Sequence, residues 1–415
     1  MDDLKSSAPW KRPMPEGQFA FLRDIVGAPS PIGLEAAMTF GVIEPAVRKF
    51  LPKGWAIRKF RGSASLVVDS APAARDAFSV MLIGHADKIR LQVRSVGEDG
   101  KVWLNSDSFL PSTLVGQEAI LFSEDPAAPG EWRVLEGATI EAVGAVHFAD
   151  PDLREGRKGI TAPMLYLELH THGADGRKQV ERMGIKAGDP VLLARKVRRG
   201  VAPDTFSGAY LDNGLGCFVV AEALRLVAES GGLRNVRILG AMAAYEEVGR
   251  LGSRVLAQEL RPDAVVAIDV AHDFKAAPGV ADKRFPPNAM GEGFTLAAGA
   301  ITSAWLNSLI ARVAQEQAIP MQWKVAGKDT GTDAMAAVLA SIDAAAASLG
   351  FPIRNMHTVS ETGHTGDVLA AIHVLVAMLR ALDGMHEGRG ARPDDLREGH
   401  PRLDRARPIS PSGSA

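Results

Sequence analysis

The pattern that most constrains the fold is an alternation of helical and strand-like segments that is interrupted once. Residues 18–88 contain two segments with helical spacing, followed by short apolar runs at 65–68 and 78–83 that suit buried strands. From about residue 206, helices and strands alternate, which is typical of a largely parallel sheet covered by helices. The sequence therefore predicts an α/β fold with a mostly parallel central sheet flanked by helices. The segments expected after residue 206 are helices at 214–229, 253–259, 303–316 and 366–383, strands at 236–244 and 264–268, and an Ala-rich helix at 334–347.

The interruption, over about residues 90–198, has a different pattern. Short alternating segments, such as 118–122 and 164–169, are separated by Gly, Pro and Asp turns, and this spacing predicts a small inserted β domain. Both chain ends are polar and rich in Pro or Arg, with little to bury. The predicted boundaries are a flexible N-terminal tail at 1–15, an α/β catalytic domain at 16–88 and 206–386, the inserted β domain at 89–205, and a disordered C-terminal tail at 387–415.

Charge and cysteine content argue against several classes of protein. The 415-residue chain has a net charge of -2, which gives no support for a nucleic-acid or membrane-surface partner. Its one cysteine, Cys217, lies in an apolar run, so we expect a core residue, no disulfide and no thiolate zinc site. The longest apolar stretch, 368–379, is shorter than the ~20 residues that span a bilayer and predicts a core helix. The N-terminus has no apolar signal region, and we predict a cytoplasmic protein.

Acidic and histidine side chains follow the predicted strands. The ends of four strands or extended segments lead into His85, into Glu246 and Glu247, into Asp269 and into His357. Because the carboxyl ends of parallel strands share one edge of a sheet, we expect these side chains along one rim. Asp212, just before the helix at 214–229, adds a fifth position to this set.

Two imidazoles and three carboxylates are typical ligands of divalent metals. The candidate ligands are His85, Asp212, Glu247, Asp269 and His357. Three carboxylates carry more negative charge than one dication would gather, whereas two ions ~3.5–4 Å apart, bridged by one carboxylate, balance it better. Each residue alone has a simpler explanation: Asp212 could be a helix N-cap, and adjacent glutamates are usually solvated. Their combination favours a dinuclear metal centre.

Seven blocks of sequence carry a resemblance that covers roughly residues 18–385. In chain order they are Gly84-His85-Ala86-Asp87, Gly184-Ile185-Lys186-Ala187-Gly188-Asp189-Pro190-Val191, Leu211-Asp212-Asn213-Gly214-Leu215-Gly216, Glu246-Glu247-Val248-Gly249, Pro262-Asp263 through Asp269-Val270, Thr330-Gly331-Thr332-Asp333-Ala334 and Pro352-Ile353-Arg354-Asn355-Met356-His357. Together they resemble the M42 metallopeptidases, the glutamyl-aminopeptidase and tetrahedral-aminopeptidase group. The β-rich segment lies between the His-x-Asp motif and Asp212, as in that family.

The resemblance implies a zinc-peptidase-like fold with an inserted small β-barrel, and a role for each site residue. His85 and Asp269 would hold one metal and Glu247 and His357 the other, while Asp212 would bridge them. Glu246 would be the general base, taking a proton from a metal-bound water and passing it to the leaving amine. Asp87 would orient His85, and Arg354, Thr332 and Asp333 would shape the site nearby.

The implied activity is a dinuclear metal-dependent aminopeptidase that removes N-terminal residues from short peptides. Zn²⁺ is the metal expected first, and Co²⁺ or Mn²⁺ also suit these ligands. The resemblance further implies a homo-oligomer, such as a dodecamer, with the β domain as the contact surface.

Two departures from the family pattern leave other readings open. Lys88-Ile89-Arg90 stands where Glu-Ile-Gly is usual, and Asn213-Gly214 stands where Asp-Arg usually follows the bridging Asp. The ligands and base are spared, but the charge beside the site changes. This motivates an alternative, a related metal-dependent amidohydrolase or deacylase acting on a non-peptide or acylated amino-acid substrate. A non-catalytic binding scaffold is a third reading, which the presence of all six residues disfavours.

Overall fold

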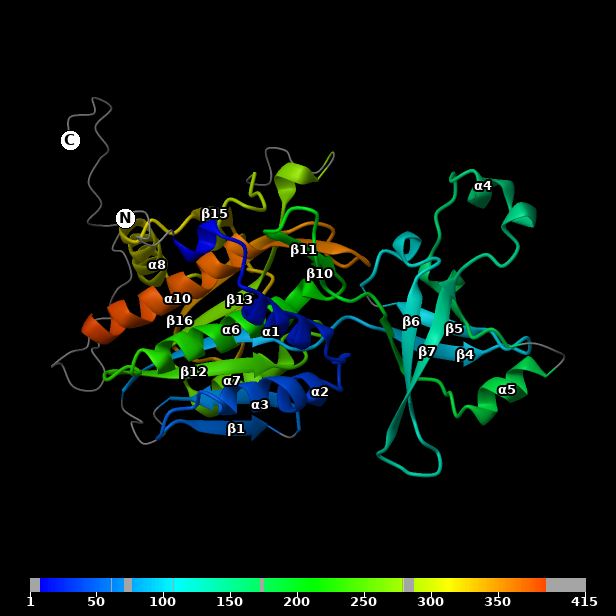
Figure 1. Cartoon of the computed structure of the whole chain (residues 1–415), viewed down its shortest axis with the longest axis horizontal. Coiled ribbons are helices and arrows are strands. Elements are labelled where there is room, and N and C mark those ends of the chain that lie inside the picture. Colours follow the sequence, from blue (N-terminus) through cyan, green and yellow to red (C-terminus); the bar gives the residue numbers. More distant parts are fainter. Residues whose placement is uncertain are drawn as a thin grey trace.

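The computed structural model describes residues 8–60, 62–70, 77–106, 108–171, 175–277, 279 and 287–385. Figure 1 shows two parts, an α/β body and a smaller β-rich part beside it. An eight-stranded sheet forms the centre of the body, and the β-rich part is a closed six-stranded barrel. The predicted fold class, an α/β fold with an inserted small β-barrel, is confirmed.

The central sheet has four parallel strands in its middle and antiparallel pairings on both sides. Its strand order is β1 (Ala56–Phe60), β2 (Ser65–Asp69), β12 (Val236–Ala243), β3 (Phe78–His85), β13 (Ala264–His272), β16 (Ala345–Ile353), β14 (Phe294–Ala298) and β15 (Met321–Val325). Every residue of β3 and β12 is buried. Both faces of these strands are therefore covered, which is why they are continuous apolar runs instead of alternating ones.

Helices cover the two faces of the sheet unequally. Val80 and Leu82 of β3 face the larger core, which also contains residues of the helices α1, α6, α8 and α10, whereas Met81 and Ile83 face a smaller core with α7. The helices of the body are α1 (Glu16–Gly27), α2 (Ala36–Met38), the π-helical turn η2 (Thr39–Ile43), α3 (Glu44–Arg48), α6 (Leu211–Glu229), α7 (Leu251–Leu260), α8 (Ala304–Glu316), α9 (Ala336–Leu339) and α10 (Thr365–Met385).

Helix α10 is the one helix in the described part of the chain that is long and apolar enough to cross a membrane. In its most apolar window, 67% of the residues are buried inside the protein, and it packs against α6, α8 and the sheet. The stretch 368–379 is therefore part of a core helix, as predicted.

The barrel is formed by the segment between β3 and α6. Its strand order is β4 (Leu91–Val96), β5 (Val102–Ser106), β8 (Tyr166–Glu168), β7 (Trp132–Glu141), β6 (Glu118–Glu124) and β9 (Pro190–Leu193), with the short helices α4 (Pro151–Arg154) and α5 (Gly176–Arg182) outside it. A separate small sheet, β10 (Arg198–Arg199), β11 (Thr205–Gly208) and β17 (Glu361–His364), forms where the chain returns to the body. The predicted limits 89–205 enclose the barrel strands, and the boundaries themselves stay a prediction.

Several sequence-based expectations differ from the structure. The Ala-rich stretch 334–347 is not one helix, because its last three residues begin the buried strand β16 between β13 and β14. Alanine favours helices, but its position in the sheet overrides that preference. The strand predicted at 264–268 continues to His272, so Asp269 lies inside β13. Strand β16 ends at Ile353, so His357 follows in a loop.

The N-terminal segment also differs from the prediction. Residues 1–7 and 386–415 lie outside the described residues. Residues 8–15, predicted to belong to a flexible tail, instead pack onto the body: Met14 is buried, and Trp10 makes an edge-to-face contact with His373 of α10.

Helix α6 approaches the sheet so closely that two glycines are required. A Cβ added to Gly84 of β3 would lie 2.5 Å from the backbone carbon of Gly216, and one added to Gly216 would lie 2.5 Å from the Ile268 carbonyl oxygen. This contact holds the first turn of α6, which contains Asp212, against the end of β3, which contains His85.

We expect Gly84→Ala to lower the free energy of unfolding by about 1–3 kcal/mol, because the added methyl group meets backbone atoms that cannot yield. Urea unfolding measures this change. The matched control is Gly17→Ala in α1, where nothing lies within 4 Å of the added Cβ and alanine favours the helix. Equal stability of the two variants would contradict the close approach.

Candidate metal centre

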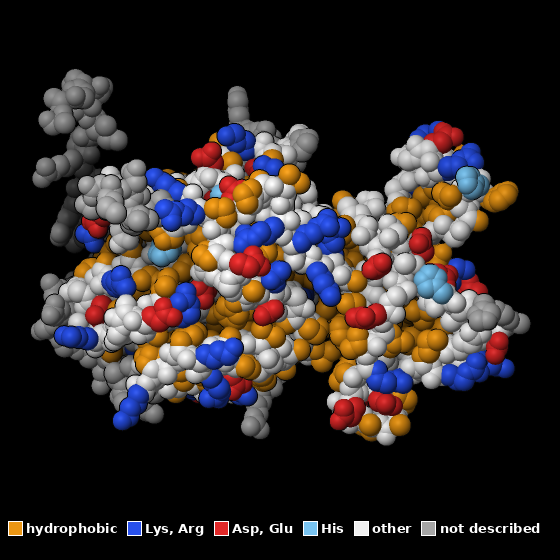
Figure 2. Space-filling view, in the orientation of Figure 1, with side chains coloured by type: hydrophobic (Ala, Val, Ile, Leu, Met, Phe, Trp, Pro, Cys, Tyr) orange, Lys and Arg blue, Asp and Glu red, His pale blue; other side chains and the backbone are white. Residues whose placement is uncertain are grey.

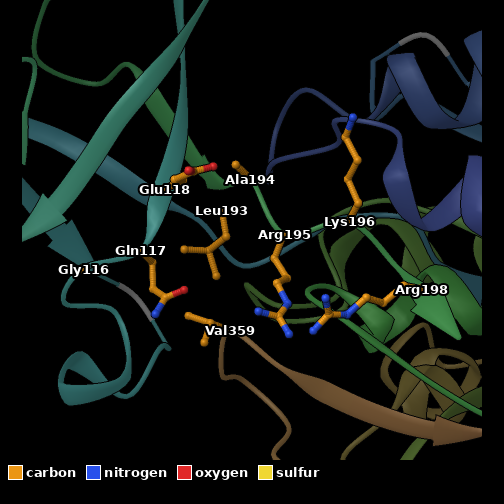
Figure 3. Close-up of a pocket in the computed structure, with 9 residues that line it drawn as sticks. All are labelled: Gly116, Gln117, Glu118, Leu193, Ala194, Arg195, Lys196, Arg198 and Val359. Atoms are coloured by element: carbon orange, nitrogen blue, oxygen red, sulfur yellow. The ribbon is translucent and has the colours of Figure 1, made fainter. Parts of the chain in front are cut away.

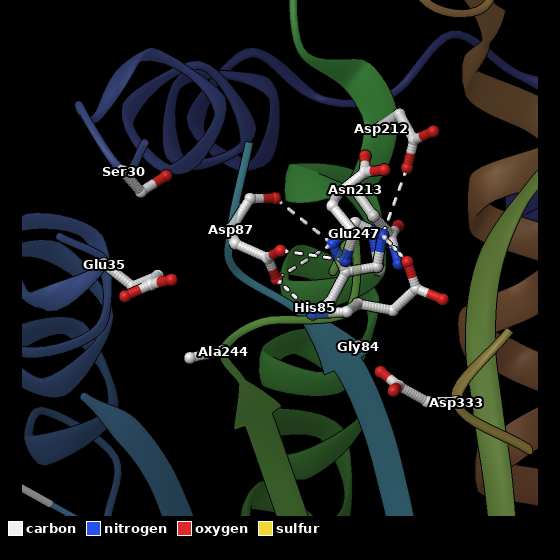
Figure 4. Close-up of polar contacts among 12 residues, drawn as sticks. Ser30, Glu35, Gly84, His85, Asp87, Asp212, Asn213, Ala244, Glu247 and Asp333 are labelled. Carbon is white, nitrogen blue, oxygen red and sulfur yellow. Dashed lines mark hydrogen bonds and ion pairs between the residues drawn. The ribbon is translucent and has the colours of Figure 1, made fainter. Parts of the chain in front are cut away.

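Side chains from five segments meet at the edge of the sheet where the parallel strands end, and Figure 4 shows part of this cluster. They are His85 at the end of β3, Asp212 in the first turn of α6, Glu247 after β12, Asp269 within β13 and His357 after β16. All five candidate ligands are thus brought together.

The cluster divides into two groups that share Asp212. In the group of His85, Asp212 and Asp269, the atoms able to bind a metal all lie within 4.8 Å of one another. The same holds for Asp212, Glu247 and His357. Asp212 Oδ1 is 3.2 Å from His85 Nε2, and Asp212 Oδ2 is 3.2 Å from His357 Nε2. One carboxylate therefore faces both groups, with one oxygen toward each imidazole.

Asp212 is available for this position because its neighbour caps the helix. The backbone at Asp212 and Asn213 is not helical, and regular helix begins after them. The Asn213 side-chain oxygen accepts a hydrogen bond from the Gly216 N–H (2.7 Å), while its amide donates to the Ile268 carbonyl (2.9 Å). The N-cap explanation considered for Asp212 thus belongs to Asn213.

Asp87 connects the histidine and glutamate segments. Its Oδ1 accepts a hydrogen bond from the Glu246 N–H and its Oδ2 from the Glu247 N–H, both at 3.0 Å. The same carboxylate lies 3.4 Å from His85 Nδ1, leaving Nε2 directed at Asp212. Asp87 is fully buried, so it fixes the orientation of His85 and the turn that carries both glutamates.

Glu246 lies beside the cluster and not within either group. Its Oε2 is 3.9 Å from His85 Nε2. Its other oxygen accepts a hydrogen bond from Arg250 Nε (3.3 Å), and Arg250 in turn pairs with Asp329 at 2.8 Å. Glu246 therefore has a carboxylate oxygen near the cluster and a second oxygen held from behind.

The cluster is electrostatically unbalanced without a cation. Burial, next to Asp212, raises the pKa of Glu247 to about 8, and burial also raises the pKa values of Glu246 and Asp269. For Asp212, burial acts in the same direction, but hydrogen bonds from the two imidazoles outweigh it and lower the pKa. With a pKa of about 8, the Glu247 carboxyl group holds a proton at neutral pH in a place where a divalent ion could replace it.

The residues present fit two divalent cations. Glu247 Oε1 is a buried oxygen with no hydrogen-bond partner among the described residues, and a buried carboxylate oxygen without a partner is costly. Imidazole and carboxylate together suit Zn²⁺, Co²⁺ or Mn²⁺.

Comparisons with known proteins show the family of this chain. The family model of the M42 glutamyl aminopeptidase matches residues 65–374. The chain belongs to the M42 glutamyl aminopeptidase family. A lysyl aminopeptidase of Pyrococcus furiosus is 28% identical over 308 residues, which cover 74% of this chain and 82% of that protein. The chain is accordingly a metallo-aminopeptidase, a hydrolase.

Solved structures show the same fold. A TET aminopeptidase from a marine-sediment Thaumarchaeota archaeon has a TM-score of 0.75 at 20% identity, covering 89% of this chain and 99% of that one. The Pyrococcus horikoshii TET1 peptidase, described as assembling into a tetrahedron or a large octahedral shell, has a TM-score of 0.69 at 19% identity, covering 87% and 98%.

Of the departures of this M42 member from the family pattern, Lys88 and Arg90 form hydrogen bonds to backbone carbonyls at and after the end of α1. Lys88 is fully buried, and its ammonium donates hydrogen bonds to the carbonyls of Val26 (2.6 Å) and Ala28 at the end of α1. Burial lowers its pKa to about 7. Arg90 donates to the Ile32 carbonyl at 3.0 Å. The expectation that Lys88 changes the charge beside the metals is therefore corrected: its charge faces α1.

Asp333, Thr332 and Arg354, which the resemblance places near the site, each have their own hydrogen-bond or ion-pair partner. Asp333 is buried and accepts a hydrogen bond from the Ser253 hydroxyl at 2.5 Å, and burial near Glu246 raises its pKa to about 7. The Thr332 hydroxyl is hydrogen-bonded to Ser348 (3.1 Å). Arg354 pairs with Asp273 at 2.8 Å, so its charge is largely balanced.

Sequence reasoning missed Glu361, which joins the segments of two candidate ligands. One oxygen of this buried carboxylate accepts hydrogen bonds from the N–H groups of Leu211 (2.6 Å) and Asp212 (3.2 Å). The other accepts from the His357 N–H at 2.8 Å. The only indication in the sequence is that Glu361 lies four residues after His357. Its hydrogen-bond donors at Leu211 and Asp212 are about 150 residues away in the chain.

We expect Glu361→Ala to weaken metal binding by about 10–100-fold, because both ligand segments lose their common anchor. Titration against a competing chelator measures the affinity. Glu361→Gln retains one acceptor oxygen, so its metal affinity should lie between those of wild type and Glu361→Ala. An unchanged affinity in the Ala variant would refute the anchoring role.

Metal binding should release protons near neutral pH. Because the folded, metal-free protein holds a proton on Glu247 below its pKa of about 8, a cation must displace it, and affinity should rise as the pH increases from 6 to 8. His357 acts in the same direction: burial lowers its pKa, but pairing with Asp212 outweighs this and raises it to about 9.

Calorimetry in buffers of different ionisation enthalpy measures the released protons. Glu247→Gln should release fewer protons than wild type. Metal affinity that is constant from pH 6 to 8 would show that these groups are already deprotonated in the metal-free protein.

Proposed function

We propose that this chain is a dinuclear aminopeptidase that removes N-terminal residues from short peptides. In this proposal His85 and Asp269 hold one divalent ion, Glu247 and His357 hold the other, and Asp212 bridges them. The observation that carries it is the position of the Asp212 carboxylate, 3.2 Å from an imidazole on either side. Two ions held there would supply Lewis-acid polarisation of a peptide carbonyl and a water of lowered pKa.

Glu246 is the proposed general base. It is not needed for either ligand group, yet its Oε2 reaches within 3.9 Å of His85 Nε2. A base must have a carboxylate close to the attacking water but not committed to a ligand role. The Glu246 carboxylate takes the proton of that water and returns it to the amine of the departing peptide. Arg250 limits the movement of this carboxylate, and Asp87 fixes its backbone.

The acidic cluster is compatible with a substrate that has a free amino group. Four carboxyl groups, those of Asp212, Glu246, Glu247 and Asp269, surround the imidazoles and would offset the charge of two divalent ions, so the loaded site would not repel an amine. Of the two departures that motivate the amidohydrolase alternative, Lys88 and the missing Arg at position 214, the first places its charge on carbonyls at the end of α1. A peptide with a free N-terminus is therefore the substrate class that we propose, and Zn²⁺ is the metal that we expect first.

We further propose that the protein forms a homo-oligomer through its barrel, with a dodecamer as one form. Figure 2 shows hydrophobic side chains exposed on the barrel. Exposed apolar residues there include Trp132, Val134, Val146 and Phe148, the last of which is 91% exposed. Large exposed apolar side chains grouped on one part mark interaction surfaces. The TET1 peptidase that shares this fold is described as assembling into large shells.

Metal content and activity of Glu246→Gln test the mechanism. We expect two metals per chain in both wild type and variant, and hydrolysis of unblocked amino-acid p-nitroanilides to fall by at least about 100-fold in the variant. The matched control is Glu259→Gln on the surface of α7, whose carboxylate is 59% exposed and pairs with Arg58. It should behave as wild type.

The outcomes separate the parts of the proposal. Loss of metal in Glu246→Gln would make Glu246 a ligand instead of a base. Two metals with no turnover of any p-nitroanilide or dipeptide in wild type would overturn the aminopeptidase assignment in favour of another amide substrate. Wild type without metal affinity would overturn the ligand set.

A further inference from the structure

A basic pocket of about 470 Å³ lies between the barrel and the α/β body. Figure 3 shows the residues around it. They are Gly116, Gln117, Glu118, Leu193, Ala194, Arg195, Lys196, Arg198 and Val359. The barrel contributes residues around β6 and β9, the returning chain contributes the cations, and Val359 comes from the loop that also carries His357. The volume is in the range of small-molecule sites.

The cations of this pocket have no acidic partner within the part of the chain that the structure describes. Arg195, Lys196 and Arg198 make no ion pair within 4.0 Å with any residue that the structure describes, including Glu118, which also lines the pocket. The Arg195 Nε is buried without a hydrogen-bond partner in the described chain. Figure 3 shows the side chains of Arg195 and Arg198 extending toward one another in the pocket that both residues line. Two guanidiniums that line one pocket, together with a buried unpaired donor, indicate a place for an anion.

The pocket is close to the candidate metal centre along the chain. Val359 is two residues from His357, so at most ~7 Å of backbone separates the pocket wall from a candidate ligand. An extended peptide advances about 3.3 Å per residue. The metal edge is lined by carboxylates and the pocket by cations, and a short free peptide has the complementary pair of charges, an amine at one end and a carboxylate at the other.

We propose that this pocket binds a carboxylate on the C-terminal side of the scissile bond, first of all the free C-terminus of a short peptide. The proposal rests on the proposed function, because it places the peptide amine at the metal edge. Arg195 and Arg198 hold the carboxylate, and the site thereby favours peptides short enough to reach both ends. An acidic side chain in the second or third residue offers the same chemistry.

Paired substrates measured with one enzyme test the pocket. The first pair is Leu-Gly-Gly and its C-terminal amide, and the second is Leu-Gly-Asp amide and Leu-Gly-Asn amide. We expect Arg195→Gln to lower the kcat/KM ratio of acid to neutral partner by about tenfold, the loss of one charge-assisted hydrogen bond. A ratio within one enzyme cancels differences in folding and metal content. The matched control is Arg94→Gln, whose exposed side chain donates to the Pro163 carbonyl of the barrel and should leave both ratios unchanged.

Each outcome decides a separate point. A fall in the first ratio supports binding of the peptide terminus, and a fall in the second supports binding of an acidic side chain. Unchanged ratios in both pairs overturn the proposal. A third pair, the p-nitroanilides of Glu and Gln, tests the N-terminal side chain. If Arg195→Gln lowers the kcat/KM ratio of this pair alone, the pocket binds the N-terminal side chain, and the proposal is also overturned.

A direct binding measurement separates failure of the pocket from failure of the function. If metal-loaded wild type hydrolyses no peptide, the aminopeptidase assignment fails first, and calorimetry with Gly-Gly and Gly-Gly amide then tests the pocket alone. Tighter binding of the acid that is lost in Arg195→Gln supports a carboxylate site. Equal binding of acid and amide overturns it.

Discussion

The shared position of the Asp212 carboxylate is the constraint on which the rest of the site depends. Each of its oxygens lies 3.2 Å from a different imidazole, and Asp269 and Glu247 are the acidic members of the two flanking groups. Burial, together with repulsion between neighbouring carboxyl groups, raises the pKa values of Glu246, Glu247 and Asp269. Positive charge must enter, as protons or as metal ions, for the arrangement to be stable. The fold provides a rigid frame that keeps the carboxyl groups together despite this repulsion.

The frame consists largely of polar side chains that bind backbone N–H groups. The Asp87 carboxylate accepts hydrogen bonds from the backbone N–H groups of Glu246 and Glu247, and the Glu361 carboxylate accepts them from Asp212 and His357. Each anchor therefore fixes the backbone of candidate ligands or base without occupying their side chains. Such anchors commonly tune a metal site as strongly as the ligands do, which is why Glu361 is expected to control metal affinity.

Sequence alone predicted the strands that carry His85 and Asp269, because both faces of these strands are buried and their apolar runs are unmistakable. It missed what depends on contacts distant in the chain. Glu361 acts on a segment 150 residues away, and nothing in its own surroundings indicates that partner. In the sequence, Asn213 was interpreted only as a change of charge beside the site. In the structure its side-chain amide donates a hydrogen bond to the Ile268 carbonyl, which an ionised Asp cannot do. The alanines at the start of β16 were predicted to be helical because alanine has a high helix propensity. That local propensity does not reveal that the segment lies between β13 and β14 in the sheet.

One residue from each departure from the family pattern, Lys88 and Gly214, lies against the end of α1. Lys88 donates to the carbonyl of Val26, and a Cβ on Gly214 would lie 2.9 Å from the Val26 side chain. Both positions therefore touch the end of α1. A glutamate at position 88 would place carboxylate oxygens, which accept hydrogen bonds, against carbonyl oxygens that also only accept them. An arginine at position 214 would collide with Val26. With either residue, the end of α1 would have to move. Because α1 contacts α6, whose first turn contains Asp212, its docking supports the metal edge from behind. These substitutions thus alter how the frame is held together, while the candidate ligands and the proposed base are unchanged in the sequence.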